Sequence, residues 1–144
     1  MGISDFVKVV ECDFTSDNVF KLLPKEGSVD VITMSYSYSM IPDQRSAMKN
    51  ATKLLKSKGI VAIADFFLKG NFDDCLPRFS RNLRSMESKF HKWWFAMDHV
   101  HLLGEEQLSY GDKLEVVWDN RFRGGVPFLP FLQPYHGVYI LSKK

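Results

Sequence analysis

The segment from Val29 to Phe67 constrains the fold more than any other part of this chain. It begins with a short apolar run rich in β-branched residues, Val29 to Met34, which is typical of a strand buried on both faces. A helical pattern follows, and a second apolar run from Ile60 to Ala64 ends in Asp65. A strand, a helix and a strand at this spacing predict a right-handed βαβ unit with two parallel strands.

The helix expected between these two strands has recognisable ends. Pro42 suits its first turn, because proline fixes φ near the helical value. Lys56 and Lys58 suit the negative end of the helix dipole, and Gly59 is expected to supply the left-handed residue at the exit. The apolar face of this helix is expected to contain Ala47, Met48, Ala51, Leu54 and Leu55.

Further strands are expected on either side of this unit. Phe6 to Val10 is rich in valine and predicts a strand, and Thr15 or Ser16 could cap a short helix after it. Leu114 to Phe122 and Gly137 to Ser142 predict two terminal strands that pair antiparallel. The alternation of strands and helices indicates an α/β fold, and residues 1–144 are expected to form a single domain.

A basic amphipathic helix is expected from Phe72 to Phe90, with apolar residues three or four positions apart. Trp93 and Trp94 follow it directly. One interpretation is a surface helix whose charges match its dipole. The other is a basic, Trp-flanked face that lies against an anionic membrane surface.

Composition excludes several classes of protein. With 144 residues the chain can bury a core, and its net charge of +2 gives no indication of nucleic-acid binding. The two cysteines, Cys12 and Cys75, show no pairing pattern, which favours free thiols in the reduced cytoplasm. Neither a membrane-spanning run nor a signal-peptide pattern is apparent.

Four stretches together resemble a known family. They are Ser35–Asp43 (SYSYSMIPD), Ala64–Phe67 (ADFF), Trp94–Leu102 (WFAMDHVHL) and Gly125–Pro130 (GVPFLP). This series is similar to the class I S-adenosylmethionine-dependent methyltransferase of betaine-lipid synthesis, which makes diacylglyceryl trimethylhomoserine. The resemblance covers nearly the whole chain and implies a Rossmann-like sheet of parallel strands with a C-terminal antiparallel pair.

One part of the family pattern is missing. The resemblance implies two further strands and a Gly-rich cofactor loop, but no Gly-x-Gly stands between a strand and a helix here. We therefore expect a partial, N-terminally truncated sheet without the first two strands of the family. The Val29 strand would then present a bare apolar edge, unless the Phe6 strand closes against it or a second chain or domain supplies the missing strands.

The resemblance also implies site residues. Asp13 matches the position that hydrogen-bonds the adenine amino group of S-adenosylmethionine, with Phe14 beside the ring, although an Asp there could equally cap a helix. Ser35, Tyr36 and Ser37 match the cofactor-binding loop beside the methyl group, and Tyr36 is also a catalytic candidate. The further candidates for a cage around the methylated nitrogen, each of which could instead be a core aromatic, are Tyr38, Trp93, Trp94 and Tyr135.

Two more catalytic candidates come from residues that can hold charge or a proton. Asp65 could orient the substrate ammonium or cap a turn. His101, or Asp98, could take the proton of the amine, because imidazole titrates near neutral pH. His99 and His101 would share a face of an extended segment, but no third ligand stands at a known metal spacing, so no metal site is predicted.

Three functions remain open from the sequence. The first is N-methylation of a lipid headgroup amine, diacylglycerylhomoserine, at the cytosolic surface of a membrane such as the endoplasmic reticulum. The second is an inactive fragment that lacks the cofactor's ribose and carboxylate contacts. The third is a methyltransferase for another small amine or carboxylate substrate.

Overall fold

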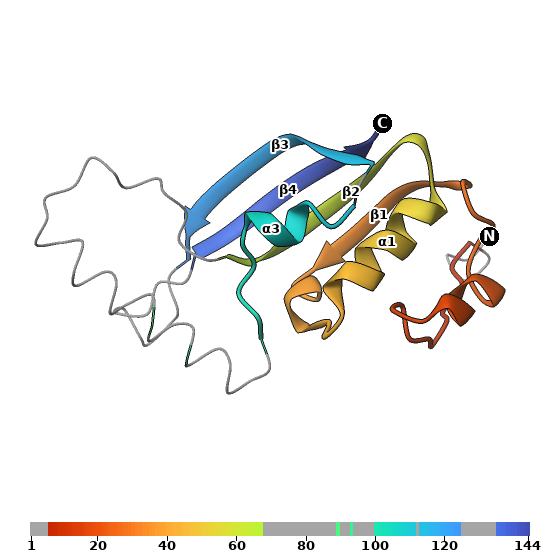
Figure 1. The fold of residues 1–144 in the computed structure, drawn as a ribbon, viewed down its shortest axis with the longest axis horizontal. Coiled ribbons are helices and arrows are strands. Elements are labelled where there is room, and N and C mark those ends of the chain that lie inside the picture. The colour runs from red at the N-terminus through yellow and green to blue at the C-terminus, as the bar shows by residue number, and fades with distance from the viewer. Residues whose placement is uncertain (1–5, 68–88, 90–92, 94–99, 112, 125–134) are drawn as a thin grey trace, which may run out of the picture.

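The computed structural model describes residues 6–67, 89, 93, 100–111, 113–124 and 135–144. Within them the chain forms a four-stranded sheet with helices on one face (Figure 1). The predicted helix from Phe72 to Phe90 lies outside the described residues, apart from Lys89. The elements in chain order are η2 (Asp17–Lys21), β1 (Val29–Ser35), η3 (Tyr38–Met40), α1 (Gln44–Leu54), β2 (Leu55–Phe67), α3 (Glu105–Leu108), β3 (Leu114–Arg123) and β4 (Tyr135–Lys143).

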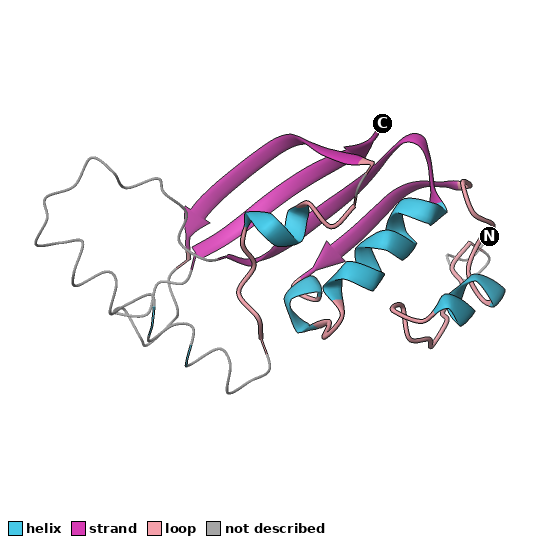
Figure 2. Ribbon diagram, viewed as in Figure 1, coloured by secondary structure: helices cyan, strands magenta, loops and turns pink. Residues whose placement is uncertain are grey.

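The sheet mixes parallel and antiparallel strands, as predicted. Its order is β1-β2-β4-β3, so the last strand of the chain lies between β2 and β3 (Figure 2). β1 and β2 are parallel, from the Val31–Ile60 pair to the Ser35–Ala64 pair. β4 is antiparallel to both of its neighbours. The α/β prediction with a closing antiparallel pair is therefore confirmed.

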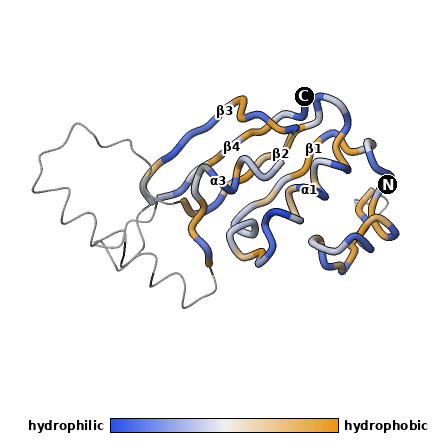
Figure 3. Tube along the Cα trace, viewed as in Figure 1, coloured by the Kyte–Doolittle hydropathy of each residue, from blue (hydrophilic) through white to orange (hydrophobic). Residues whose placement is uncertain are grey.

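Helix α1 forms where the sequence predicts it and buries the predicted face. Its N-cap is Asp43, whose carboxylate accepts a hydrogen bond from the Ser46 backbone N–H at 3.0 Å. Pro42 precedes this cap instead of entering the first turn. All five predicted apolar residues are buried, and four of them, Ala47, Met48, Ala51 and Leu55, pack with residues of β1, β2 and β4 into one core. Figure 3 shows hydrophobic residues along β2 and β4 in the middle of the sheet.

The turn between α1 and β2 corrects the sequence prediction. The left-handed residue is Lys58, with φ of 62°, and not Gly59. Gly59 serves a different purpose, because a Cβ there would lie 3.0 Å from the Lys56 carbonyl oxygen and 3.1 Å from that of Val29. The chain enters β2 directly at Leu55 and bulges before Ile60, so the glycine permits close backbone approach.

The predicted strand from Phe6 to Val10 does not form. Phe6 begins a turn, and the side chains of Phe6 and Val9 are 78% and 91% exposed. A strand needs a hydrogen-bonded neighbour, and among the described residues β1 pairs only with β2. The short helix after it is η2, which Ser16 caps by accepting from the Asn18 N–H at 3.2 Å, as predicted.

Lys143 joins the end of β4 to the end of α1. Its Nζ donates to the carbonyl oxygens of Thr52 and Leu55, each at 2.7 Å, which satisfies two acceptors at the C-terminal end of the helix. We expect Lys143→Met to lower the free energy of unfolding by about 1.5–3 kcal/mol, the range for a hydrogen bond to a charged group. Urea denaturation measures this loss.

The matched control for that prediction is Lys144→Met. Lys144 forms an exposed ion pair with Glu115 at 3.5 Å, and exposed pairs contribute about 0–1 kcal/mol. Equal losses in the two variants would show that the Lys143 contacts do not stabilise the helix end.

No helix among the described residues is long and apolar enough to cross a membrane.

Candidate functional site

The loop at the carboxyl end of β1 exposes polar side chains in an unusual backbone conformation. Ser35, Tyr36 and Ser37 are all exposed. Tyr36 has φ of 46°, and its N–H donates to the Ala64 carbonyl oxygen at 2.7 Å. A bulky residue with positive φ is uncommon and clusters at functional sites. The tip of β1 is therefore bent sharply where it leaves the sheet beside β2.

Asp65 anchors this loop through hydrogen bonds to its carboxylate. Its side chain is only 1% exposed. Its Oδ2 accepts from the Ser39 N–H at 2.9 Å, and its Oδ1 accepts from the Ser39 hydroxyl at 2.6 Å and the Phe66 N–H at 2.8 Å. A buried carboxylate with three donors fixes the position of the chain that supplies them. Asp65 thus fixes Ser39, which follows the exposed Ser35, Tyr36 and Ser37 in the same loop.

A row of rings crosses the sheet next to Tyr36. His136 on β4 pairs with Phe66 on β2 and with Phe122 on β3, so the three side chains share one face. Ring centroids lie 5.2 Å apart for Tyr36 and Phe66, 4.9 Å for Phe66 and His136, and 5.4 Å for Phe122 and His136. The hydroxyl of Tyr36 lies 3.1 Å from Nδ1 of His136.

The surroundings of His136 affect its charge. Burial lowers the pKa of this imidazole, and the negative charge of Asp65 opposes part of that change. The folded chain therefore keeps a neutral imidazole to a lower pH than the unfolded chain does. This difference in pKa favours the folded chain at a pH above the ordinary histidine pKa. That contribution to the free energy of unfolding is lost as the pH falls through the lowered pKa of His136.

The Asp13–Phe14 segment is tied to α1. The Asn50 side chain, which is buried, donates to the Phe14 carbonyl oxygen at 3.0 Å. Oδ1 of Asp13 accepts from the Thr15 N–H at 2.9 Å and from the Thr15 hydroxyl at 2.7 Å. These bonds lower the pKa of the Asp13 carboxyl. Oδ2 has no hydrogen bond among the described residues, so an exposed acceptor is available to a ligand.

The other predicted site residues occupy different environments. His101 is exposed, and its backbone N–H donates to the Ser39 carbonyl oxygen at 2.9 Å, which places it next to the same loop. Tyr38 is completely buried, so it belongs to the core and not to an accessible cage. Trp93 is exposed and Tyr135 is half-buried at the start of β4. Trp94, Asp98 and His99 lie outside the described residues.

No group of three or more His, Cys, Asp or Glu side chains that could hold a metal ion occurs in the described part of the chain.

Sequence analysis did not identify the ring row of Phe66, Phe122 and His136. Tyr36 and His136 are 100 positions apart, and no local motif links them. The signal that would have found them is the register of β4, because the Asp65–Gly137 pair places His136 beside Phe66.

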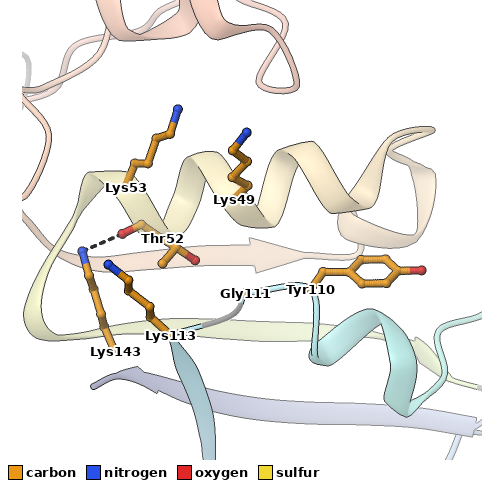
Figure 4. A pocket seen from close by; sticks show the side chains of 7 residues that line it. All are labelled: Lys49, Thr52, Lys53, Tyr110, Gly111, Lys113 and Lys143. Atoms are coloured by element: carbon orange, nitrogen blue, oxygen red, sulfur yellow. Dashed lines mark hydrogen bonds between the residues drawn. The ribbon is translucent and has the colours of Figure 1, made fainter.

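A separate hollow of about 250 Å³ lies at the other end of α1, around the Lys143 contacts (Figure 4). It is remote from the carboxyl ends of β1 and β2, because Lys143 sits where α1 ends. The hollow is lined by Lys49, Thr52, Lys53, Tyr110, Gly111, Lys113 and Lys143.

Comparison with protein families identifies the class. Residues 5–109 match the model of the methyltransferase domain family. The chain therefore belongs to the methyltransferase domain family. No curated protein sequence matches the chain.

Solved structures share this fold. A SAM-dependent methyltransferase from Methanosarcina mazei has a TM-score of 0.59 at 14% identity, with 91% of this chain and 64% of that chain covered. A candidate sarcosine dimethylglycine methyltransferase from Galdieria sulphuraria has a TM-score of 0.61 at 13% identity, with coverage of 99% and 61%. A candidate histamine N-methyltransferase from Thermotoga maritima has a TM-score of 0.56 at 18% identity, with coverage of 96% and 65%.

The chain thus spans a little under two thirds of the length of these relatives. At such low identity the likeness establishes the fold, and the chemistry has to be inferred from the site.

Proposed function

We propose that this chain is the catalytic unit of a SAM-dependent N-methyltransferase, and that its substrate is the amine of a lipid headgroup of the diacylglycerylhomoserine type. The observation that carries the methyltransferase assignment is the edge of the sheet where β1 and β2 end. It combines a strained, exposed tyrosine and two exposed serine hydroxyls with a buried carboxylate that accepts hydrogen bonds from Ser39 of the same loop. Ligands of open α/β sheets bind at this edge.

The described residues fit the adenine end of S-adenosylmethionine. Asp13 offers a free Oδ2 acceptor for an exocyclic amine, and Phe14 is a partly buried aromatic residue beside it. Ser35 and Ser37 offer exposed hydroxyls on the other segment. When bound, S-adenosylmethionine supplies a sulfonium methyl group that an amine lone pair displaces in line, a reaction that depends mainly on alignment.

Cofactor binding is the first test. We expect isothermal titration calorimetry of the full chain with S-adenosylmethionine to give a Kd in the micromolar range. Asp13→Ala should weaken binding about tenfold or more, because a hydrogen bond to a charged group contributes about 1.5–3 kcal/mol.

Asp30→Ala is the matched control, since Asp30 is an exposed carboxylate whose ion pair with Lys56 lies at the start of β1. It should bind S-adenosylmethionine as the unchanged chain does. Absence of binding by the unchanged chain would instead support the inactive-fragment hypothesis.

The lipid substrate rests on the motif series from Ser35 to Pro130 and requires its own test. The names of the relatives from Galdieria and Thermotoga favour a second candidate, a small soluble amine such as a methylated glycine or histamine. Transfer of radiolabelled methyl groups to diacylglycerylhomoserine in vesicles, compared with sarcosine and histamine in solution, distinguishes the two. Labelling of the soluble amines alone, with no flotation of the chain on anionic vesicles, would contradict the lipid assignment.

A further inference from the structure

We propose that Tyr36 and His136 act as one proton-accepting pair that removes the proton of the substrate ammonium before methyl transfer. This proposal rests on the proposed function, because it assigns a role within the same site. Nothing in the motif series includes His136, and the geometry of the folded sheet brings it to Tyr36.

The two side chains are held in place from several directions. The bent backbone at Tyr36 directs its hydroxyl to Nδ1 of His136, at 3.1 Å. Phe66 and Phe122 flank the imidazole from the neighbouring strands, and the Phe122 ring stacks on it with an interplanar angle of 12°. Tyr36 itself is 45% exposed, so its oxygen can contact a bound substrate. His136 then contacts the Tyr36 hydroxyl and not the substrate.

The proton passes from the substrate ammonium to Tyr36, and the hydroxyl proton of Tyr36 passes to His136. His136 begins as the neutral tautomer that carries its proton on Nε2, so that Nδ1 accepts from the Tyr36 hydroxyl. As the ammonium gives its proton to the Tyr36 oxygen, the hydroxyl proton of Tyr36 moves to Nδ1. The amine is left with a free lone pair, Tyr36 is again a phenol, and His136 is an imidazolium that later releases its proton to solvent.

Among the described residues, the titratable group in contact with His136 is Tyr36 from the loop after β1, and β3 contributes the apolar ring of Phe122. Asp65 of β2 acts on the imidazole through its negative charge. Burial lowers the pKa of His136, so the imidazole is neutral, and able to accept a proton, at neutral pH. Asp65 is less suited to this role, because its buried oxygens already accept three hydrogen bonds. The Asp65 charge would, however, stabilise the imidazolium.

The same rings suit the chemical class of the substrate. Tyr36, Phe66 and Phe122 present aromatic faces around the pair, and such faces attract ammonium ions, including fully methylated ones. The pair would therefore serve an amine substrate, whereas an acid or a neutral hydroxyl would gain nothing from the aromatic faces.

Gly124 provides a way to displace the imidazole without removing it. A Cβ at Gly124 would overlap Nε2 of His136, so Gly124→Ala should push the ring away from Tyr36. A side chain at the residue that follows β3 thus becomes a probe of the Tyr36–His136 distance.

The first experiment measures the tautomer and the hydrogen bond of His136 without any cofactor. In ¹⁵N NMR spectra of the full chain we expect His136 as the Nε2–H tautomer with a hydrogen-bonded Nδ1, and a titration midpoint below the ordinary value of about 6.5. Tyr36→Phe and Gly124→Ala should each remove the signature of the Nδ1 hydrogen bond. A His136 imidazole in the Nδ1–H tautomer, or one that is unaffected by Tyr36→Phe, would overturn the proposal.

The second experiment measures methyl transfer to diacylglycerylhomoserine in phosphatidylcholine vesicles. His136→Gln and Tyr36→Phe should each lower kcat about 100-fold, the effect typical of a lost general base. In His136→Gln, whose side chain lies outside the cofactor-binding loop, the Kd for S-adenosylmethionine should change less than about twofold. The rate of the unchanged chain should rise with pH through the His136 midpoint found by NMR. In His136→Gln this rise should disappear, and added imidazole should restore part of the rate.

The outcomes separate the two proposals. An active unchanged chain whose rate survives His136→Gln overturns the role of the pair and leaves the proposed function standing. The same result together with a large loss in His101→Gln would assign the base to His101. An unchanged chain that binds no S-adenosylmethionine and transfers no methyl group overturns the proposed function, and the role of the pair with it.

Discussion

Replacement of Asp65 by alanine is expected to lower the free energy of unfolding by about 3–5 kcal/mol, the largest effect of any polar substitution considered. The carboxylate is buried and accepts from the Ser39 N–H, the Ser39 hydroxyl and the Phe66 N–H. Alanine leaves these donors without their acceptor and opens a space beneath the loop. Chemical denaturation followed by circular dichroism measures the loss.

Two controls make this prediction specific. Ser39→Ala removes only one donor to Asp65 and should cost about 1 kcal/mol. Asp30→Ala removes an exposed carboxylate from a surface ion pair and should cost less than about 1 kcal/mol. If Asp65→Ala is no less stable than Asp30→Ala, the carboxylate does not anchor the Ser35–Ile41 loop.

Tyr38→Ala is expected to cost about 3–5 kcal/mol, as is usual when a large buried ring is removed. Tyr38 of η3 is completely buried, and its hydroxyl donates to the carbonyl oxygen of Gln107 on α3 at 3.0 Å. The Gln44 side chain donates in turn to the Tyr38 carbonyl oxygen at 3.1 Å. Burial also raises the pKa of the Tyr38 phenol far above its usual range, so the hydroxyl stays protonated as a donor.

Tyr38→Phe separates the hydroxyl from the ring in that measurement. The phenylalanine variant keeps the packing and should lose only about 1–2 kcal/mol, because one carbonyl acceptor is left unsatisfied. A loss in Tyr38→Ala no larger than in Tyr38→Phe would contradict the assignment of Tyr38 to the core.

The sequence predicted the fold best where an element depends on residues that are close together in the chain. The βαβ unit follows from two apolar runs and one helical face, and the structure places Ala47, Met48 and Ala51 against the sheet as expected. The closing antiparallel pair follows from two well-defined strand patterns. In each case the signal lies within about 15 residues, where periodicity alone determines which side chains are buried.

Predictions failed where the outcome depends on distant partners. The valine-rich run from Phe6 to Val10 has strand composition, yet a strand requires a neighbour, and none pairs with it among the described residues. Lys58, and not Gly59, takes the left-handed conformation, while the Lys56 and Val29 carbonyl oxygens approach Gly59 too closely for a Cβ. Glycine is needed at position 59 because a Cβ there would crowd two carbonyl oxygens, and not because the backbone has a positive φ.

In the candidate site, too, residues that follow a strand could be predicted, and a residue that depends on a distant partner could not. Ser35, Tyr36 and Ser37 were found because they follow a strand, and the structure exposes all three at its tip. Asp65 was found for the same reason, but its burial and its bonds to Ser39 indicate a positioning role. His136 could not be found, because its place beside Tyr36 depends on the register between β2 and β4.

NMR mapping of S-adenosylmethionine on the full chain tests most directly whether the cofactor binds where β1 and β2 end. Binding at this edge of the sheet predicts chemical-shift changes concentrated at Asp13, Phe14 and Ser35 to Ser37, with the His136 imidazole affected through Tyr36. Shift changes confined to the lysine-lined hollow around Lys49, Lys113 and Lys143, with none at the Tyr36 loop, would contradict it.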